Sequence, residues 1–198
     1  MRALWSVLAL AGCLALAGCG GSNQPAAPPA AKPTAITQLD PGRMHVVRVA
    51  FCDLVPKSAV RNALDAAPLR ARSWRNGDRL RDAGGQVGHE FGCAWYGPHG
   101  RVARAWVFAR PVSPAFARSL VRLADRDPGC TAAAAKTFGR PALVQTCLRS
   151  GSPRRIRHAG LFGQSWLTCE TSGHGPAKAL RARSDAWCTS VADALDAG

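Results

Sequence analysis

The stretch that decides the fold runs from His89 to Arg110 and reads HEFGCAWYGPHGRVARAWVFAR. Two runs that favour β structure, 89–96 and 102–110, flank the turn sequence GPHG at 97–100. In the second run Val, Arg, Trp and Phe alternate with smaller residues, a pattern typical of a strand with one buried face. The stretch therefore predicts two strands that pair as an antiparallel hairpin.

Helical signals border this pair of strands on both sides. Before it, Pro56 suits the first turn of a helix, where its fixed φ fits and its missing N–H is not needed. Apolar residues follow Pro56 at helical spacing, namely Val60, Leu64 and Ala67. After the strands, Ser113-Pro114 combines an N-cap residue with a proline at the first helical position. The sequence therefore predicts one helix before the hairpin and one after it.

Two further segments complete the first half of the chain. Residues 46–51 form a short apolar run that predicts a strand ending at Cys52. Residues 68–87 are polar and rich in Arg and Gly, which predicts an exposed loop. The first half thus follows the order cysteine, helix, strand, strand, helix.

The second half repeats this order. After Cys130, an alanine-rich helix is predicted at 132–136, followed by strand-like runs at 141–148 and 156–170. The clearest helix covers 177–197, where apolar residues form one stripe. Together the halves predict an α+β fold in which an antiparallel sheet has helices packed on one face. An internal αββα duplication is one interpretation of the repeated order.

The first eighteen residues have the parts of an export signal. Arg2 precedes an apolar run at 4–17, and Leu16-Ala17-Gly18 precedes Cys19. Small residues at this position fit a signal peptidase cleft, and about fourteen apolar residues are too few for a transmembrane helix. Segment 1–18 resembles a lipoprotein signal with its lipobox, which implies cleavage before Cys19 and acylation of its thiol. A rival motif ends at Cys13, but it would leave apolar residues stranded on the mature chain.

The mature chain divides into a linker and a domain. Residues 19–36 are rich in Gly, Ser, Pro and Ala, and such a chain buries too little surface to offset its ordering entropy. This segment is predicted to be a disordered spacer after the lipidated Cys19. Residues 37–198 have the length of one ordinary domain. The protein is therefore predicted to be exported and held on the outer face of the cell membrane by its lipid anchor.

Six cysteines remain downstream of Cys19, and an even number in an oxidising compartment predicts three disulfides. Zinc binding is the competing interpretation, but no Cys-x-x-Cys or Cys/His pair has metal-ligand spacing. If the two halves of the chain correspond, equivalent cysteines bridge equivalent elements. The pairs are then Cys52–Cys93, Cys130–Cys147 and Cys169–Cys188.

The chain is strongly basic, with 26 Lys and Arg against 12 Asp and Glu and a net charge of +14. Two interpretations stay open: a compositional bias that aids solubility, or attraction to anionic lipid headgroups or a cell-wall polymer. Under the second, the candidate binding residues are a cluster of Arg70, Arg72, Trp74 and Arg75. A nucleic-acid partner is not expected, because the chain is exported. The oligomeric state is left open.

Through its motifs CDLVP at 52–56 and CAW at 93–95, the chain resembles small exported lipoproteins of actinobacteria. In that family a lipobox and a Pro/Ala-rich linker precede a domain of unassigned function with Cys-Asp-Leu and Cys-x-Trp motifs. The resemblance covers the signal, the linker and about half of the domain. It implies export, disulfides and an α+β fold, and it carries over no catalytic residue.

No residue pattern identifies an active site. Ser165 lies in GQSW, which lacks the closing glycine of a nucleophile elbow. The chain has two Glu, Glu90 and Glu170, each predicted on a strand where an ion pair with Arg is expected. The His residues lack metal-binding spacing, so no metal, cofactor or catalytic residue is predicted. The leading hypothesis is a non-enzymatic domain that binds an unknown envelope ligand; the alternative is an envelope hydrolase with an unrecognised active site.

Overall fold

A computed structural model describes residues 35–80 and 84–198. The predicted signal at 1–18, the lipidation site Cys19 and the linker up to residue 34 lie outside the described residues, so these stay predictions. The helices are α1 (Lys57–Leu64), α2 (Pro114–Ala124) and α3 (Ala177–Leu195), with 3-10 turns η1 (Ile36–Gln38) and η3 (Pro98–Gly100). The strands are β1 (Arg70–Trp74), β2 (Arg79–Leu80), β3 (Gln86–Val87), β4 (Glu90–Tyr96), β5 (Val102–Phe108), β6 (Cys130–Ala135), β7 (Ala142–Cys147), β8 (Arg154–Phe162) and β9 (Ser165–Gly173).

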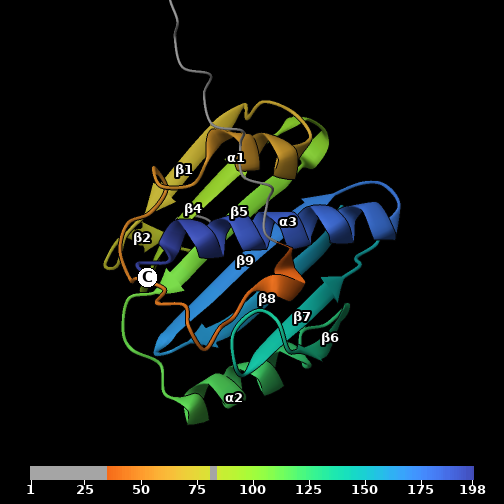
Figure 1. The fold of residues 1–198 in the computed structure, drawn as a ribbon. Coiled ribbons are helices and arrows are strands. Elements are labelled where there is room, and N and C mark those ends of the chain that lie inside the picture. Colours follow the sequence, from red (N-terminus) through yellow and green to blue (C-terminus); the bar gives the residue numbers. More distant parts are fainter. Residues whose placement is uncertain (1–34, 81–83) are drawn as a thin grey trace, which may run out of the picture. The chain divides into compact units, whose positions relative to one another are not determined.

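Seven strands form one sheet in the order β1-β4-β5-β9-β8-β7-β6, and every neighbouring pair is antiparallel. The hairpin predicted from residues 89–110 is confirmed as β4 and β5, with η3 in the turn between them. Strand β9 pairs with β5 and so joins the later strands to this hairpin (Figure 1). The short strands β2 and β3 pair separately.

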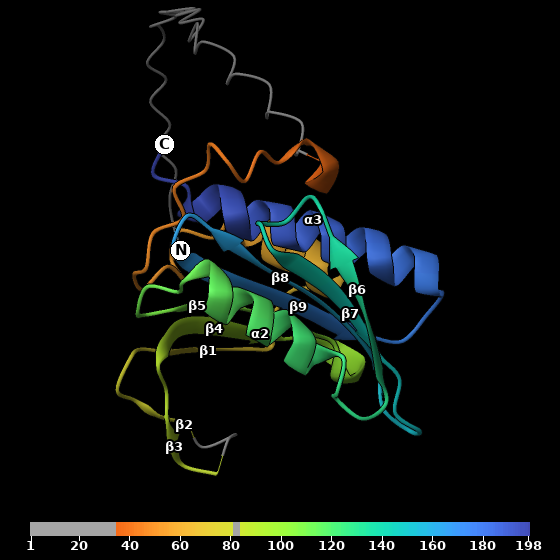
Figure 2. The same cartoon turned by 90° about the horizontal axis from the view of Figure 1, so that it is seen from below.

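The main core lies between the sheet and the helices α1 and α3, which cover one of its faces (Figure 1). Trp187 of α3 is buried there, with its ring 5.4 Å from that of Trp95 in an edge-to-face arrangement. Helix α2 lies on the opposite face (Figure 2), because Ala117 packs against Leu143 and Ala159, side chains that alternate to that side of their strands. The predicted α+β fold with an antiparallel sheet is therefore confirmed, and α2 differs from the expectation that the helices share one face.

Two local predictions are wrong because pairing within the sheet overrides composition. The segment 68–87 contains β1 and the β2–β3 hairpin, where an exposed loop was expected. Its arginines fit an edge strand because their aliphatic stems can lie on the sheet while the charged ends reach water. Residues 132–136, predicted as a helix from the high helix propensity of alanine, instead belong to β6, which pairs with β7 from Cys130 to Ala135.

Two further segments differ from the prediction. Residues 46–51 do not form a strand of the sheet: Val46 makes a single bridge to Asp196, and the N–H of Val47 donates to the carbonyl of Leu195. The C-terminal end of α3 therefore satisfies this backbone. The run 156–170 is two strands, β8 and β9, because Gly163 adopts a left-handed φ of 59° and turns the chain back on itself.

All three predicted disulfides are confirmed, namely Cys52–Cys93, Cys130–Cys147 and Cys169–Cys188. The structure does not show the internal αββα duplication, because the second half begins with a strand where the first half has α1. The bridges are consistent with an oxidising, exported environment. Within residues 35–80 and 84–198, no helix has both the length and the apolar character needed to cross a membrane.

Candidate ligand-binding groove

The face of the sheet that carries α2 holds three adjoining cavities, and α2 and the β2–β3 hairpin lie on this side of the sheet (Figure 2). The first, of about 210 Å³, is lined by β1, β4 and β5, and the second, of about 270 Å³, lies between α2 and the sheet. The third, of about 510 Å³, shares Glu90 with the first and Phe108 with the second. Trp106 lines both the first and the second. We name the three together the sheet-face groove, the first cavity its cationic end, and the second its apolar slot.

Alternate residues of neighbouring strands build the cationic end. Because successive side chains of a strand point to opposite faces, Arg72 and Trp74 of β1 share the groove face with Arg104 and Trp106 of β5. The small residues of β4 between them leave the space that these larger side chains enclose. The lining is Arg72, Trp74, Leu80, Glu90, Ala94, Tyr96, Arg104 and Trp106.

Trp74 lies against the backbone of Gly92, its direct partner in β4, where any Cβ would collide with the indole ring. Only glycine permits this position of the ring. The indole Nε1 donates a 3.0 Å hydrogen bond to Oε1 of Glu90. Burial raises the pKa of the Glu90 carboxyl above its ordinary value, and the bond from Trp74 and the charge of His89 offset part of that rise. A proton on Glu90 would leave the cavity more positive.

Arg104 is a half-buried cation without a carboxylate partner among residues 35–80 and 84–198. Its Nε is buried and makes no hydrogen bond there. Glu170, its neighbour across β5 and β9, instead accepts two hydrogen bonds from Arg157, at 3.0 and 2.9 Å. From the opposite face, Nε1 of Trp187 donates to the carbonyl of Arg104 and supports the strand at this point. A buried N–H without a partner costs free energy, which a bound anion would recover.

The apolar slot lies between α2 and strands β7, β8, β9 and β5. Its two charged residues, Asp127 and Arg157, are both held in ion pairs. Gln145 is fully buried, and its Nε2 donates a 2.8 Å hydrogen bond to the carbonyl of Ala124 at the end of α2. The other residues of the lining are Trp106, Phe108, Leu120, Leu123, Leu143, Ala159, Trp166 and Thr168.

The four predicted binding residues have different positions in the structure. Arg72 and Trp74 line the cationic end. Arg70 shares their face of β1 and lies with its Cζ 4.0 Å from the centroid of the Tyr96 ring. Arg75 follows the strand, is exposed and is not part of the lining. The structure therefore brings two of the four into the groove and keeps a third beside it.

Sequence reasoning missed Arg104 and Trp106 as groove residues. The alternation of 102–110 already placed Arg104 and Trp106 on one face of a strand, since they are two residues apart. That signal does not reveal which face of the sheet stays open. The guanidinium of Arg157 lies with its Cζ 5.5 Å from the centroid of the Trp106 ring, a contact between strands separated by β9.

The residues considered for catalysis are not brought together. Ser165 is buried, and its Oγ donates a 2.6 Å hydrogen bond to the carbonyl of Val46. His158 is buried on the α3 side, where its Nε2 lies 2.9 Å from Oδ1 of Asp185. Glu170 is held by Arg157 on β8. Ser165, His158 and Glu170 are therefore each engaged with a different partner.

Among the residues that the structure describes, one cluster has ligand atoms close enough for a metal ion: Asp127, Cys130 and Cys147. The two sulfur atoms are bonded to each other, so neither is a thiolate that could bind a cation. The guanidinium of Arg155 also lies 3.1 Å from Sγ of Cys147 and 3.3 Å from a carboxylate oxygen of Asp127. The positive charge at this position is therefore already supplied by arginine.

The fold and the groove define the protein as a disulfide-linked α+β domain with a cationic and apolar groove on one face of its antiparallel sheet. The chain matches no family model and no curated protein.

Proposed function

We propose that the protein is a lipid-anchored envelope protein, attached through Cys19 to the outer face of the cell membrane, whose domain binds a ligand with a phosphate or carboxylate group. The sequence of the export signal supports the anchor. Three disulfides support an oxidising location. The activity is proposed to be binding, because the groove offers cations and aromatic rings, while the Ser165 hydroxyl donates to a backbone carbonyl.

The observation that carries this proposal is the state of Arg104. Its half-buried guanidinium lines a cavity, its Nε lacks a hydrogen-bond partner, and the adjacent Glu170 is committed to Arg157. A charged group in this state is costly unless a counter-charge reaches it. An anion in the cationic end would supply that counter-charge and accept the unused N–H.

The surroundings of Arg104 favour phosphate or carboxylate over a small halide ion. Arginine presents a planar set of donors that matches two oxygens at once, and Arg72 lines the same cavity. Trp74 and Trp106 add apolar walls that exclude water and strengthen the charge interaction. The ionised Glu90 carboxylate would repel a bound anion, and a proton on Glu90 removes that repulsion. The raised pKa of Glu90 favours the protonated form.

The proposal is tested by replacing Arg104 with Gln and measuring the binding of glycerol phosphate by titration calorimetry. We expect binding at least about tenfold weaker, because hydrogen bonds to charged groups contribute roughly 1.5–3 kcal/mol. In the wild type the affinity should also fall as salt is raised, since part of the site is open to solvent.

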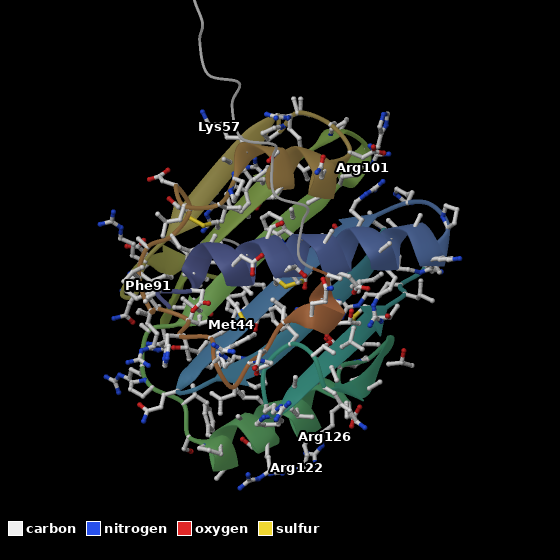
Figure 3. The ribbon with its side chains drawn as sticks, viewed as in Figure 1. Met44, Lys57, Phe91, Arg101, Arg122 and Arg126 are labelled. Carbon is white, nitrogen blue, oxygen red and sulfur yellow. A yellow bond between two sulfur atoms is a disulfide. The ribbon has the colours of Figure 1, made fainter. Side chains whose placement is uncertain are left out.

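Arg122→Gln is the matched control, since it removes the same charge from an exposed position of α2 that points away from the domain (Figure 3). It should bind glycerol phosphate as the wild type does. Equal weakening by both substitutions would show that only net charge matters. No weakening by either would remove the cationic end from the function.

A further inference from the structure

We propose that the apolar slot holds the hydrocarbon chain of the same ligand, so that the ligand is a single-chain anionic lipid. This inference rests on the proposed function, because the cationic end must bind the anionic head. The two parts of the groove lie side by side: Trp106 lines both, and Arg104 precedes it by two residues on the same face of β5. A head at Arg104 therefore places its chain next to the slot.

The chemistry of the slot suits a hydrocarbon chain. Leucine, alanine and aromatic side chains form most of its lining, and its charged residues Asp127 and Arg157 are already balanced by ion pairs. Within the described residues the slot therefore offers no unpaired charge, and the polar atom of its lining that lacks a partner is Oε1 of Gln145. The volume of about 270 Å³ is well above the roughly 150 Å³ at which an apolar cavity binds benzene. One chain segment fills a space of this size.

Helix α2 is fixed at its ends and loosely packed between them. The N–H of Val112 donates to the carbonyl of Gln164 before the helix, and Gln145 donates to Ala124 at its end. Ala117 is the one residue of α2 that is fully buried. Phe116 and Leu123 stay 51% and 55% exposed. The helix thus offers more apolar surface than the sheet beneath it covers, and a chain in the slot would contact part of that surface.

Three probes separate the head from the chain: decanoyl lysophosphatidic acid, glycerol phosphate, and monodecanoylglycerol, each below its micelle concentration. In the wild type we expect the lysophosphatidic acid to bind at least tenfold more tightly than glycerol phosphate, since burial of two methylenes contributes about a factor of ten. Its binding should also show the more negative heat-capacity change, which marks apolar burial.

Leu120→Trp fills the slot from α2 and should bring the affinity ratio of lysophosphatidic acid to glycerol phosphate down to about one. Arg118→Trp adds the same side chain at an exposed position of α2 outside the slot and should keep the wild-type ratio. If Leu120→Trp does not fold, Leu123→Asp places a charge at a half-exposed slot residue and should lower the ratio as well.

The possible outcomes separate this inference from the proposed function. A wild-type ratio near one, with both probes weakened by Arg104→Gln, overturns the lipid assignment and leaves a soluble or polymer-bound anion as the ligand. Binding of monodecanoylglycerol equal to that of lysophosphatidic acid, and insensitive to Arg104→Gln, overturns the cationic end and the inference together. A high ratio that Leu120→Trp and Leu123→Asp leave unchanged places the chain outside the slot and overturns the inference alone.

Discussion

At the scale of single residues, Trp74, Gly92 and Glu90 depend on one another. The missing Cβ of Gly92 lets the indole lie on β4, and the indole Nε1 then reaches the Glu90 carboxylate. An aromatic ring over a glycine of the neighbouring strand fills a gap in the sheet that a side chain would otherwise occupy. The result is a carboxyl group held at the wall of the cationic end, between two cavities.

The raised pKa of Glu90 makes stability depend on pH. The folded protein holds this proton above pH 4.5, the ordinary value, where the unfolded chain has lost it. The stabilising contribution is therefore present below that value and is lost as the pH rises through the folded pKa. Glu90→Gln keeps an acceptor for Trp74 but cannot ionise. We expect its free energy of unfolding to rise relative to wild type as the pH increases above 4.5, measured by denaturant titration; parallel curves would contradict this.

The role of a single residue could be predicted from the sequence where that role depends only on residues close by in the chain. The cap at Ser113 is confirmed, because a hydroxyl three residues before an N–H needs no knowledge of the rest of the chain. The cluster around Trp74 was recognised from its composition, but its position on a strand was not. Arg104 could not be identified, because its lack of a partner depends on Glu170 being taken by Arg157 across the sheet.

At the scale of elements, α2 spans the apolar slot between two end contacts. The Ser113 hydroxyl accepts from the N–H of Phe116 at the start, and Gln145 donates to Ala124 at the end. The Oε1 of Gln145 has no partner within the described part of the chain. One side-chain amide of β7 therefore holds the helix end and also carries an unmatched acceptor.

Replacing Gln145 with Leu should loosen the end of α2 with little change in global stability. The lost hydrogen bond contributes about 0.5–1.5 kcal/mol, and removal of the unmatched acceptor returns a similar amount. We expect faster amide hydrogen exchange in the last turn of α2 and a free energy of unfolding within about 1 kcal/mol of wild type. Ser113→Ala is the matched change at the other end and should cost about 1 kcal/mol. Unchanged exchange in Gln145→Leu would show that packing alone fixes the helix end.

Elements whose apolar residues repeat at a regular spacing were predictable from the sequence. Elements whose conformation depends on pairing with a neighbouring strand were not. The β4–β5 hairpin and α3 have apolar patterns that only one type of structure buries. β6 is alanine-rich and its sequence favours a helix, yet its pairing with β7 and the Cys130–Cys147 bridge make it a strand. Neither apolar periodicity nor local composition predicts the groove, because it exists only where α2 and β1 leave part of one sheet face uncovered.

At the scale of the whole domain, three disulfides connect parts that are distant in sequence. Cys52–Cys93 ties the segment before α1 to β4, Cys130–Cys147 ties the edge strand β6 to β7, and Cys169–Cys188 ties β9 to α3. The pairing was predicted correctly through a duplication that the structure does not show. The cysteines are joined in consecutive pairs along the chain, although the elements that carry them differ between the two halves.

The bridges should be reduced in a fixed order. Cys130 is partly exposed on an edge strand, whereas Cys169 and Cys188 are fully buried. Because a thiolate must reach a sulfur atom to attack it, graded reduction should open Cys130–Cys147 before Cys169–Cys188. Loss of the first bridge should lower stability by about 2–4 kcal/mol. Alkylation followed by peptide mass analysis after each step records the order; simultaneous or reversed opening would contradict it.

The contact between residues 45–47 and 195–197 has a mechanical consequence. The N–H of His45 donates to Asp196 at 2.7 Å, and the N–H of Val47 donates to Leu195 at 3.0 Å. A tension applied from the N-terminal side would reach these two bonds after it had disturbed the packing of Leu39 and Met44 in the core. If they opened, extension would stop at Cys52, whose covalent link passes the force into β4. Force applied to the residues before Cys52 would then enter the sheet through β4, a strand that does not line the apolar slot between α2 and the sheet.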